Sequence, residues 1–209
     1  MGVSKEKIVL IGGGGHARAA VDTIESMGQY EIVGFVDPRT DTNYKSYSTI
    51  GSDDDLKRIY DQGVTNAAIT VGFLGGSKLR EDLYHRAKEI GFKFPPIIDP
   101  SAAVANDAVI GEGAFIGKLS VIDSNVRLGT MTIVNLATVI GHDCCLGDFS
   151  HIAVNAALCG GVKTGKFVFV GANAVVIQKV SLGDDALIGA GSVVLRDVEA
   201  GQRAVGVYA

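Results

Sequence analysis

The residues VNLATV-IGHDCC-LGDFSH (134–151) form three consecutive hexapeptides in one register. Each begins with an aliphatic residue, and four positions later comes Thr138, Cys144 or Ser150. Stepping by six in both directions extends the register over sixteen repeats, from Val104 to Val194, and only Thr164 interrupts the aliphatic series. Glycine directly follows the aliphatic residue in nine of the sixteen repeats. A short period that holds without an insertion predicts a solenoid.

This pattern resembles the hexapeptide repeat of left-handed parallel β-helix acyltransferases, and the resemblance covers about residues 98–201. It implies that each hexapeptide is one short strand plus one turn, and that three of them make a triangular coil. The aliphatic and small residues then fill the prism. Glycine is expected at its corners because it adopts tight-turn backbone conformations more easily than other residues. A β-helix that serves only as a non-catalytic scaffold is the alternative.

Residues between the small and the aliphatic positions are expected to point outward, because side chains alternate along a strand. They fall on three faces: one apolar with small side chains, one mixed and polar, and one bulky and apolar apart from His151. In this order the faces contain Ala103, Val121, Val139, Ala157, Val175 and Val193; Val109, Arg127, Cys145, Lys163, Ser181 and Glu199; and Phe115, Ile133, His151, Phe169 and Leu187. Contiguous apolar walls mark interfaces. The sequence therefore predicts a homotrimer, as is usual in this family, with active sites between chains and His151 in the cleft.

The first half of the chain alternates strands and helices instead. Strands are expected at residues 7–11, 31–36 and 66–71, and helices at 17–27, 53–60 and 78–90. This alternation predicts a small parallel, Rossmann-like α/β sheet that is at most half of a full dinucleotide fold. The helical pattern stops near Pro95 and Pro96, so the predicted domains are residues 1–95 and 96–209.

Two of the four histidines, His142 and His151, lie in the hexapeptide region and are expected to project away from the core. Acyl transfer from a thioester to an amine or hydroxyl needs a base for the acceptor's proton and donors for the oxyanion. His142 follows Ile140 by two residues, which places it at a corner. A plain surface histidine is the alternative for both residues, and His85 is expected to be one.

Residues 134–151 also resemble the active-site stretch of the PglD/NeuD-like sugar acetyltransferases of bacterial glycan and sialic-acid pathways. The resemblance implies that His142 is the base, that Asp143 polarises it, and that His151 contacts both acetyl donor and acceptor. It implies a sugar contact for Asn135, for which a simple turn residue is the alternative. For the co-substrate acetyl-CoA it implies contacts along the helix edge, with Gly160 supplying the oxyanion donor, at Gly160, Gly171, Ala172, Gly189 and Ala190.

The string IGGGGHA (11–17) follows a predicted strand and opens a predicted helix. It satisfies the pattern G-x-G-x-x-A with Gly12, Gly14 and Ala17, and such glycines let a phosphate approach the backbone at a helix N-terminus. Asp37 follows about twenty residues later, where dinucleotide folds use an acid for the ribose. Taken alone, the motif predicts NAD, so an NAD-dependent oxidoreductase is a second hypothesis.

The longer string GGGGHARAAVD (12–22) resembles the opening of the same sugar acetyltransferases, in which this small domain holds a UDP-linked sugar. The resemblance implies that Gly12, Gly14 and His16 lie near the pyrophosphate. It implies that Asp37 lies near the uracil and Gly72 below the base.

Three departures from the family pattern stand out. Phe73 follows Gly72 where Asn is frequent, Pro38 follows Asp37, and the ending GVYA (206–209) has Tyr208 in place of Pro and lacks a basic tail. If the basic tail of the family helps to hold the phosphates of CoA, other basic residues must do so here, and Lys179 and Arg196 are the candidates.

Composition narrows the class of protein further. The net charge of −4 gives no general attraction to nucleic acid, and no apolar run is long enough for a membrane span. From the opening residues no signal peptide is expected, and three cysteines without a CxxC pair suit the cytoplasm. Some β-helix enzymes bind zinc with three histidines, but this helix has two, so no metal is expected.

We therefore expect a cytoplasmic, acetyl-CoA-dependent N-acetyltransferase that acts on a nucleotide-linked amino sugar, with UDP as the expected nucleotide. O-acetylation of a sugar or of sialic acid is the alternative within the same enzyme class.

Overall fold

The computed structural model describes residues 5–39, 43–73, 75–76 and 78–209. The chain forms two compact units, which are Met1–Gly72 with Lys78–Ile97 and Phe73–Ser77 with Ile98–Ala209. The short segment that begins at Phe73 thus belongs with the second unit, although it lies well before the predicted boundary. The predicted division at residues 95/96 stays a prediction.

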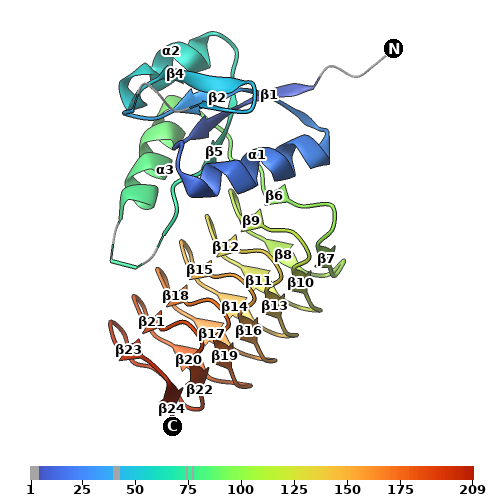
Figure 1. The fold of residues 1–209 in the computed structure, drawn as a ribbon, viewed down its shortest axis with the longest axis vertical. Coiled ribbons are helices and arrows are strands. Elements are labelled where there is room, and N and C mark those ends of the chain that lie inside the picture. The colour runs from blue at the N-terminus through green and yellow to red at the C-terminus, as the bar shows by residue number, and fades with distance from the viewer. Residues whose placement is uncertain (1–4, 40–42, 74, 77) are drawn as a thin grey trace. The chain divides into compact units, whose positions relative to one another are not determined.

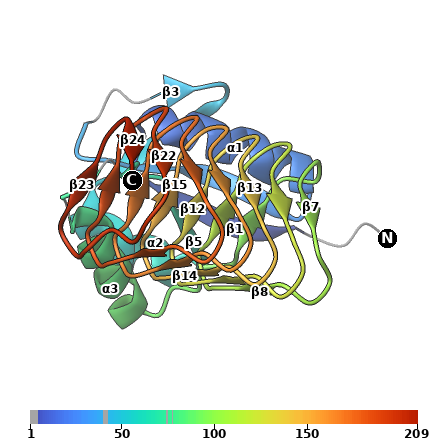
Figure 2. The same ribbon diagram turned by 90° about the horizontal axis from the view of Figure 1, so that it is seen from below.

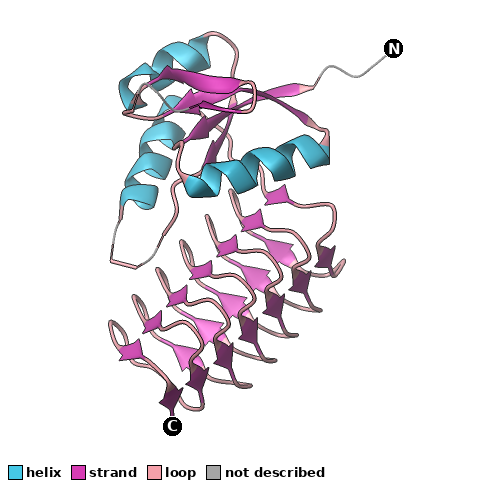
Figure 3. Cartoon of the chain, viewed as in Figure 1, coloured by secondary structure: helices cyan, strands magenta, loops and turns pink. Residues whose placement is uncertain are grey.

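The first unit is a sheet with the strand order β3-β4-β2-β1-β5, in which β4, β2, β1 and β5 are parallel (Figure 1, Figure 3). Its elements are β1 (Glu6–Ile11), α1 (Gly15–Met27), β2 (Tyr30–Val36), β3 (Asn43–Tyr44), β4 (Tyr47–Gly51), the 3₁₀ turn η1 (Asp53–Asp55), α2 (Leu56–Asp61), β5 (Asn66–Ile69) and α3 (Leu79–Ile90). The central strand is buried throughout Ile8–Ile11, as expected of a parallel strand covered on both faces. The predicted strands and helices are present, but the edge pair β3–β4 was missed because it is mostly half-exposed and polar.

The second unit is a parallel β-helix of two-residue strands in three sheets, seen from below in Figure 2. The first sheet contains β7 (Ala103–Val104), β10 (Val121–Ile122), β13 (Val139–Ile140), β16 (Ala157–Leu158), β19 (Val175–Val176), β22 (Val193–Val194) and β24 (Val207–Tyr208). The second contains β8 (Val109–Ile110), β11 (Arg127–Leu128), β14 (Cys145–Leu146), β17 (Lys163–Thr164) and β20 (Ser181–Leu182). The third contains β6 (Ile97–Ile98), β9 (Phe115–Ile116), β12 (Ile133–Val134), β15 (His151–Ile152), β18 (Phe169–Val170), β21 (Leu187–Ile188) and β23 (Arg203–Ala204). These sheets reproduce the three predicted faces.

The core of the prism consists of the aliphatic residues of the repeat, with small residues between them. Where the small residue carries a hydroxyl group, that group donates to a main-chain carbonyl oxygen. Ser120 Oγ donates to Asn135 O at 2.7 Å, and Thr138 Oγ1 donates to Ala153 O at 3.0 Å. Each buried hydroxyl is therefore satisfied, and burying it carries no unpaired polar group.

The corner glycines have a different role from the predicted one. A Cβ atom at Gly141 would lie 2.9 Å from Gly160 N, and one at Gly129 would lie 2.6 Å from Asp148 N. The close stacking of successive coils requires these glycines. The left-handed backbone occurs two residues later, at positions such as Ala137 (φ 56°) and Asp143 (φ 61°), where non-glycine residues are common.

The C-terminal end departs from the uninterrupted register. In the earlier coils each strand residue pairs with the residue eighteen positions later in the chain, as Val139 does with Ala157. Leu187 instead pairs with Arg203, and Val193 pairs with Val207, so the last coil is shorter. The regular hexapeptides therefore end near Val194. None of the helices among the described residues has the length and apolar character needed to cross a bilayer.

Candidate active site

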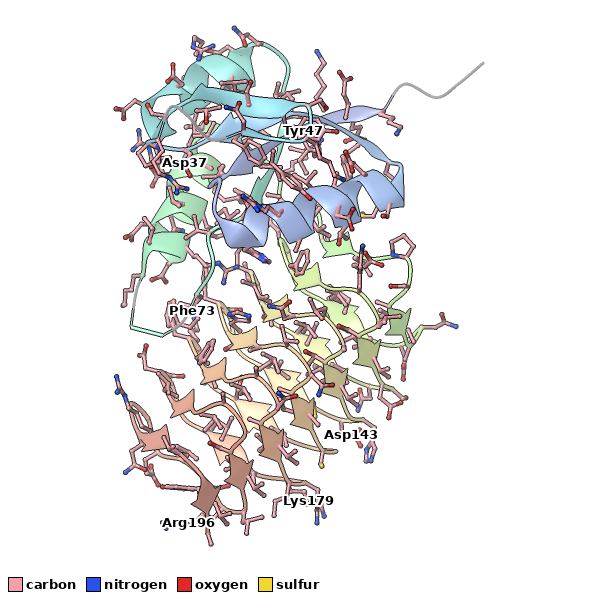
Figure 4. The ribbon with its side chains drawn as sticks, viewed as in Figure 1. Asp37, Tyr47, Phe73, Asp143, Lys179 and Arg196 are labelled. Carbon is pink, nitrogen blue, oxygen red and sulfur yellow. The ribbon has the colours of Figure 1, made fainter. Side chains whose placement is uncertain are left out.

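His142 and Asp143 form a hydrogen-bonded pair at the corner that follows β13. His142 Nδ1 lies 2.8 Å from Asp143 Oδ2, and Asn125 Nδ2 donates to Asp143 Oδ1 at 2.8 Å. Because a carboxylate can only accept, the imidazole proton is on Nδ1 and the lone pair of the neutral ring is on Nε2. Both side chains are exposed, and Asp143 lies at the edge of the coils in Figure 4. The arrangement presents an oriented base at the surface.

The same hydrogen bond changes the acidity of both groups. The contact with Asp143 raises the pKa of His142 above its ordinary value, and a weaker attraction to Asp123 adds to this. Hydrogen bonds from His142 and Asn125 lower the pKa of Asp143. Asp143 therefore stays ionised, and the neutral, basic form of His142 becomes more abundant as the pH rises through its raised pKa.

The imidazole of His142 lies over Gly160, which occupies the equivalent position in the next coil. A Cβ atom at position 160 would be 2.5 Å from Nε2 and 2.6 Å from Cε1. Gly161 N donates to His142 O at 2.8 Å and ties the two corners together. Glycine at position 160 thus allows the ring to lie against the main chain, which brings the reactive nitrogen close to backbone groups. The predicted oxyanion contact at Gly160 stays a prediction.

His151 lies on the third sheet and is buried in the single chain, with 7% of its surface exposed. Its Nδ1 is 2.6 Å from the carbonyl oxygen of Phe73, which can only accept, so Nδ1 carries a proton. Asn135 Nδ2 lies 3.3 Å from Nε2, and the ring of Phe169 meets the imidazole edge-on at 5.3 Å. Figure 4 labels Phe73 beside the coils. The predicted cleft between chains at His151 stays a prediction. Sequence reasoning missed the contact with Phe73, because nothing in the hexapeptide register indicates that Phe73 reaches His151.

The predicted site residues of the β-helix lie on two different edges of the prism. Asn135 follows a strand of the third sheet, and Gly171, Ala172, Gly189 and Ala190 lie at the same edge because they follow β18 and β21. His142 follows a strand of the first sheet. One whole side of the triangle, formed by the first sheet, separates these edges. A single chain therefore brings Asn135 to His151 but does not bring either of them to His142.

The glycine-rich string forms the turn between β1 and α1. Gly12 has a φ of 104°, and a Cβ atom there would lie 2.7 Å from Val71 Cγ2, so only glycine fits. Gly14 is the N-cap residue of α1, and its carbonyl oxygen accepts from Ala17 N at 3.1 Å. His16 is in the first turn of α1, close to Gly72. This geometry suits a phosphate group.

Asp37 is held by the glycine-rich turn and by Arg39, which sequence reasoning missed. Gly13 N donates to Oδ2 at 2.6 Å, and Arg39 donates to both carboxylate oxygens from Nε at 2.9 Å and from Nη2 at 3.0 Å. These bonds, chiefly the one from the Arg39 side chain, lower the pKa of Asp37 to about 2. Asp37 is buried, and its carboxylate connects the glycine-rich turn between β1 and α1 to the end of β2.

A pocket of about 290 Å³ opens beside this turn within the first unit. Its walls are mostly apolar, and the lining residues include Ile11, Gly12, Gly13, Gly14, Val36, Asp37, Pro38, Arg39, Asp53, Thr70, Val71, Gly72, Leu79 and Leu83. The carboxylate of Asp53 makes no hydrogen bond or salt bridge with any described residue, whereas its main-chain oxygen accepts from Leu56 N. Partial burial raises the pKa of the carboxyl group. The pocket thus combines a phosphate-type turn, apolar walls and one acceptor group.

The chain is similar to known proteins over its whole length. Residues 7–87 match the PglD N-terminal domain, and residues 161–196 match the bacterial transferase hexapeptide of six repeats. PerB from Caulobacter crescentus, solved with CoA and GDP-perosamine, is 32% identical, with 99% of this chain and 97% of that chain covered at a TM-score of 0.92. The acetyltransferase domain of PglB from Neisseria gonorrhoeae, solved with acetyl coenzyme A, is 30% identical, with 97% of both chains covered at a TM-score of 0.91.

The chain belongs to the PglD/NeuD-like family of hexapeptide-repeat sugar acetyltransferases. Its second unit is accordingly a left-handed β-helix, and the protein is an acyltransferase. The hypotheses of an NAD-dependent oxidoreductase and of a non-catalytic scaffold are set aside by this membership. Among the described residues, no three His, Cys, Asp or Glu side chains are grouped as metal ligands would be. Cys144 is buried, with its Sγ 3.2 Å from Cys159 O, and Cys145 is exposed on the second sheet.

Proposed function

We propose that this enzyme transfers the acetyl group of acetyl-CoA to the amino group of a nucleotide-linked amino sugar in bacterial glycan biosynthesis. The observation that carries the proposal is the His142–Asp143 pair, in which the tautomer leaves Nε2 as an exposed base. The perosamine N-acetyltransferase of C. crescentus, solved with CoA and GDP-perosamine, supports an amine as acceptor. Acetylation of a sugar hydroxyl remains the alternative.

In the proposed reaction the amine nitrogen attacks the thioester carbonyl carbon while His142 Nε2 removes one of its protons. Main-chain N–H groups near Gly160 stabilise the negative charge that develops on the carbonyl oxygen. The carbon–sulfur bond then breaks, and the proton held by His142 passes to the departing sulfur. The products are an amide and free CoA, and His142 returns to its neutral form with Asp143 still ionised. Deprotonation by a positioned base accounts for about 10²–10⁴-fold of the rate.

We further propose that the site forms between neighbouring chains of a homotrimer. Since Asn135 and His151 lie on one edge of the prism and His142 on another, a neighbouring chain must supply one of the two groups. The exposed apolar side chains Val121 and Val139 of the first sheet support such an interface. Phe115 and Ile133 on the third sheet are already buried within one chain, so that sheet offers a neighbour less surface than the sequence suggested.

The nucleotide is proposed to bind in the pocket beside the glycine-rich turn, with its pyrophosphate at Gly12, Gly14 and His16. The resemblance of residues 12–22 to the family's opening implies UDP. The free acceptor Asp53 in this pocket favours guanine, because guanine presents two adjacent N–H donors to a carboxylate. Uracil presents a single N–H donor that is flanked by two carbonyl oxygens, and a carboxylate repels both of these oxygens. We therefore propose GDP over UDP as the carrier.

The test is acetyl transfer by the purified chain from acetyl-CoA to GDP- and UDP-linked amino sugars, followed by thiol release and product mass. We expect an amide product with a GDP-linked sugar, and loss of at least a hundredfold in kcat for His142→Ala. His85→Ala removes an exposed histidine from α3 and is the matched control. Full activity of His142→Ala, or an ester product cleaved by hydroxylamine, contradicts the proposal.

A further inference from the structure

Asn125 occupies the position in its coil that Asp143 occupies in the next one. Both residues have a left-handed backbone, with φ 56° for Asn125 and 61° for Asp143. Asn125 Nδ2 donates to Asp143 Oδ1 at 2.8 Å, while Asp143 Oδ2 lies 2.8 Å from His142 Nδ1 (Asp143 is labelled in Figure 4). The two carboxylate oxygens therefore have different partners. Rotating the carboxylate away from the imidazole would break both hydrogen bonds.

The main chain of Asn125 is itself fixed by hydrogen bonds to both neighbouring coils. Asp107 Oδ2, in the preceding coil, accepts from Asn125 N at 3.1 Å and from Ser124 Oγ at 2.7 Å. Asp143 N, in the following coil, donates to Ser124 O at 3.0 Å. Asn125 thus extends from a backbone that is held on both sides, and its amide group is presented to Asp143 in one direction.

A neutral donor suits this position. Hydrogen bonds from His142 and from Asn125 lower the pKa of Asp143 and keep it ionised. A cation at position 125 would compete with the ring of His142 for the carboxylate, and a second carboxylate would repel it. The amide supplies a hydrogen bond without either effect.

The charges around the pair do not depend on Asn125. The groups that face it are carboxylates of two preceding coils, the buried thiol of the same hexapeptide, the glycines of the next coil and a cation of the coil after that, namely Asp107, Asp123, Cys144, Gly160, Gly161 and Lys179. Asp123 adds to the rise in the pKa of His142. Removing the neutral side chain of Asn125 leaves all of these charges in place, so its effect on His142 is one of geometry.

We propose that Asn125 is a positioning residue for acetyl transfer, which holds the carboxylate of Asp143 toward His142 and thereby orients the base. This inference rests on the proposed function, in which His142 Nε2 takes the proton of the amine. Asn125 acts through Asp143, so its loss reduces the fraction of time for which the imidazole is correctly oriented. The affinity for either substrate does not change.

Asn125→Gly tests the proposal, because glycine adopts a φ of 56° without strain. With acetyl-CoA and GDP- or UDP-linked amino sugars, we expect kcat to fall about fivefold, as for loss of one hydrogen bond, and both KM values to stay nearly unchanged. The midpoint of the pH profile of kcat/KM is expected to move to lower pH, because the carboxylate that raises the pKa of His142 faces the ring for less of the time.

Asn155→Gly is the matched control. Asn155 is exposed like Asn125, has the same φ of 56°, and donates from Nδ2 to Asn173 Oδ1 at 2.6 Å, again across eighteen positions. Its partner is an amide and not a carboxylate bonded to histidine. The two substitutions are expected to lower the melting temperature by similar amounts, whereas Asn155→Gly is expected to leave the midpoint of the pH profile in place.

A double variant separates positioning from a general loosening of the coils. In a chain that already carries Asp143→Gly, no carboxylate remains for Asn125 to orient, so Asn125→Gly is expected to add little to the loss in kcat. NMR titration of the His142 ring in the unaltered chain and in Asn125→Gly measures the pKa without substrate. The resonance is assigned by its absence from His142→Ala. The pKa is expected to be lower in Asn125→Gly.

The outcomes distinguish the inference from the function on which it rests. An unchanged pKa of His142 in Asn125→Gly, an equal shift of the midpoint in Asn155→Gly, or losses in kcat that multiply in the double variant overturn the positioning role while acetyl transfer by the unaltered chain still stands. Absence of acetyl transfer by the unaltered chain overturns the proposed function, and with it any role of Asn125 in the reaction.

Discussion

The imidazole of His142 lies against the main chain of Gly160, so closely that a methyl group at position 160 would fall 2.5 Å from Nε2. Gly160 has no left-handed φ, so alanine fits its backbone, and the substitution acts on the neighbouring ring. We expect Gly160→Ala to displace the imidazole and to lower kcat/KM about a hundredfold. The melting temperature is expected to change little. Steady-state kinetics and thermal unfolding measure the two quantities separately.

A double variant gives the control for this prediction. If Gly160→Ala acts through the ring of His142, it adds little to the defect of His142→Ala, because the affected group is already absent. If the losses in kcat/KM of the two single variants multiply in the double variant, that explanation is contradicted and position 160 has a separate role.

The hydrogen bond between His142 and Asp143 predicts the pH profile. Activity requires the neutral imidazole, so kcat/KM of the unaltered enzyme rises with pH through a pKa above the ordinary histidine value. Asp143→Asn removes the carboxylate that raises this pKa, so the midpoint is expected to move to lower pH. The plateau is expected to fall about a hundredfold, because the ring loses its fixed orientation. An unmoved midpoint contradicts the assignment of His142 as the titrating base.

The separation of the two edges predicts complementation between inactive chains. One chain carries His142→Ala, and the other carries Asn135→Ala with His151→Asn. In each mixed trimer an intact His142 meets an intact Asn135–His151 pair at about one in three interfaces. Co-expression with two different affinity tags, followed by tandem purification, provides the mixed species for assay. Recovery of activity is expected, and its absence would place the whole site within one chain.

Asp37 predicts a pH-dependent stability of the first unit. Its pKa of about 2 lies below that of an unfolded aspartate, so its stabilisation is complete above pH 4 and is lost as the pH falls to 2. Asp37→Asn is therefore expected to lower the free energy of unfolding by about 2 kcal/mol at pH 7. The difference from the unaltered chain is expected to shrink below pH 4.

Tyrosine fluorescence during urea unfolding measures this difference, because five of the six tyrosines lie in the first unit and the chain has no tryptophan. Arg58→Ala breaks the exposed pair with Asp55 and is the control, with an expected effect below about 1 kcal/mol. Equal effects of the two substitutions would show that Asp37 makes no special contribution.

The β-helix could be predicted almost completely from the sequence, because its period is local. The position of Val139 in its hexapeptide determines its sheet and its outward direction, and no distant residue alters either. The same holds for the outward placement of His142 at a corner. Prediction failed where the period ends, since the pairing of Val193 with Val207 depends on turns that contain no repeat.

The remaining errors concern contacts between residues far apart in the chain. The Phe73 carbonyl reaches His151 across 78 positions, and no residue type in between marks that contact. Arg39 was missed for a different reason: a lone arginine after a strand is common, and only the geometry of Asp37 gives it a partner. The role of the corner glycines was misjudged because the tight contact at Gly141 comes from the neighbouring coil.

Because the coils stack at a constant spacing, equivalent positions along one edge of the β-helix are separated by a fixed distance per coil. Every eighteen residues return the chain to the same edge one step further on, with the same outward direction. Inserting or deleting one such block between His142 and Arg196 changes the distance between them by a single step and leaves the local surroundings of both intact. The distance between two positions on this edge can therefore change only in steps of one coil. Homologous chains that differ by whole blocks are expected to bind molecules of different length along the edge.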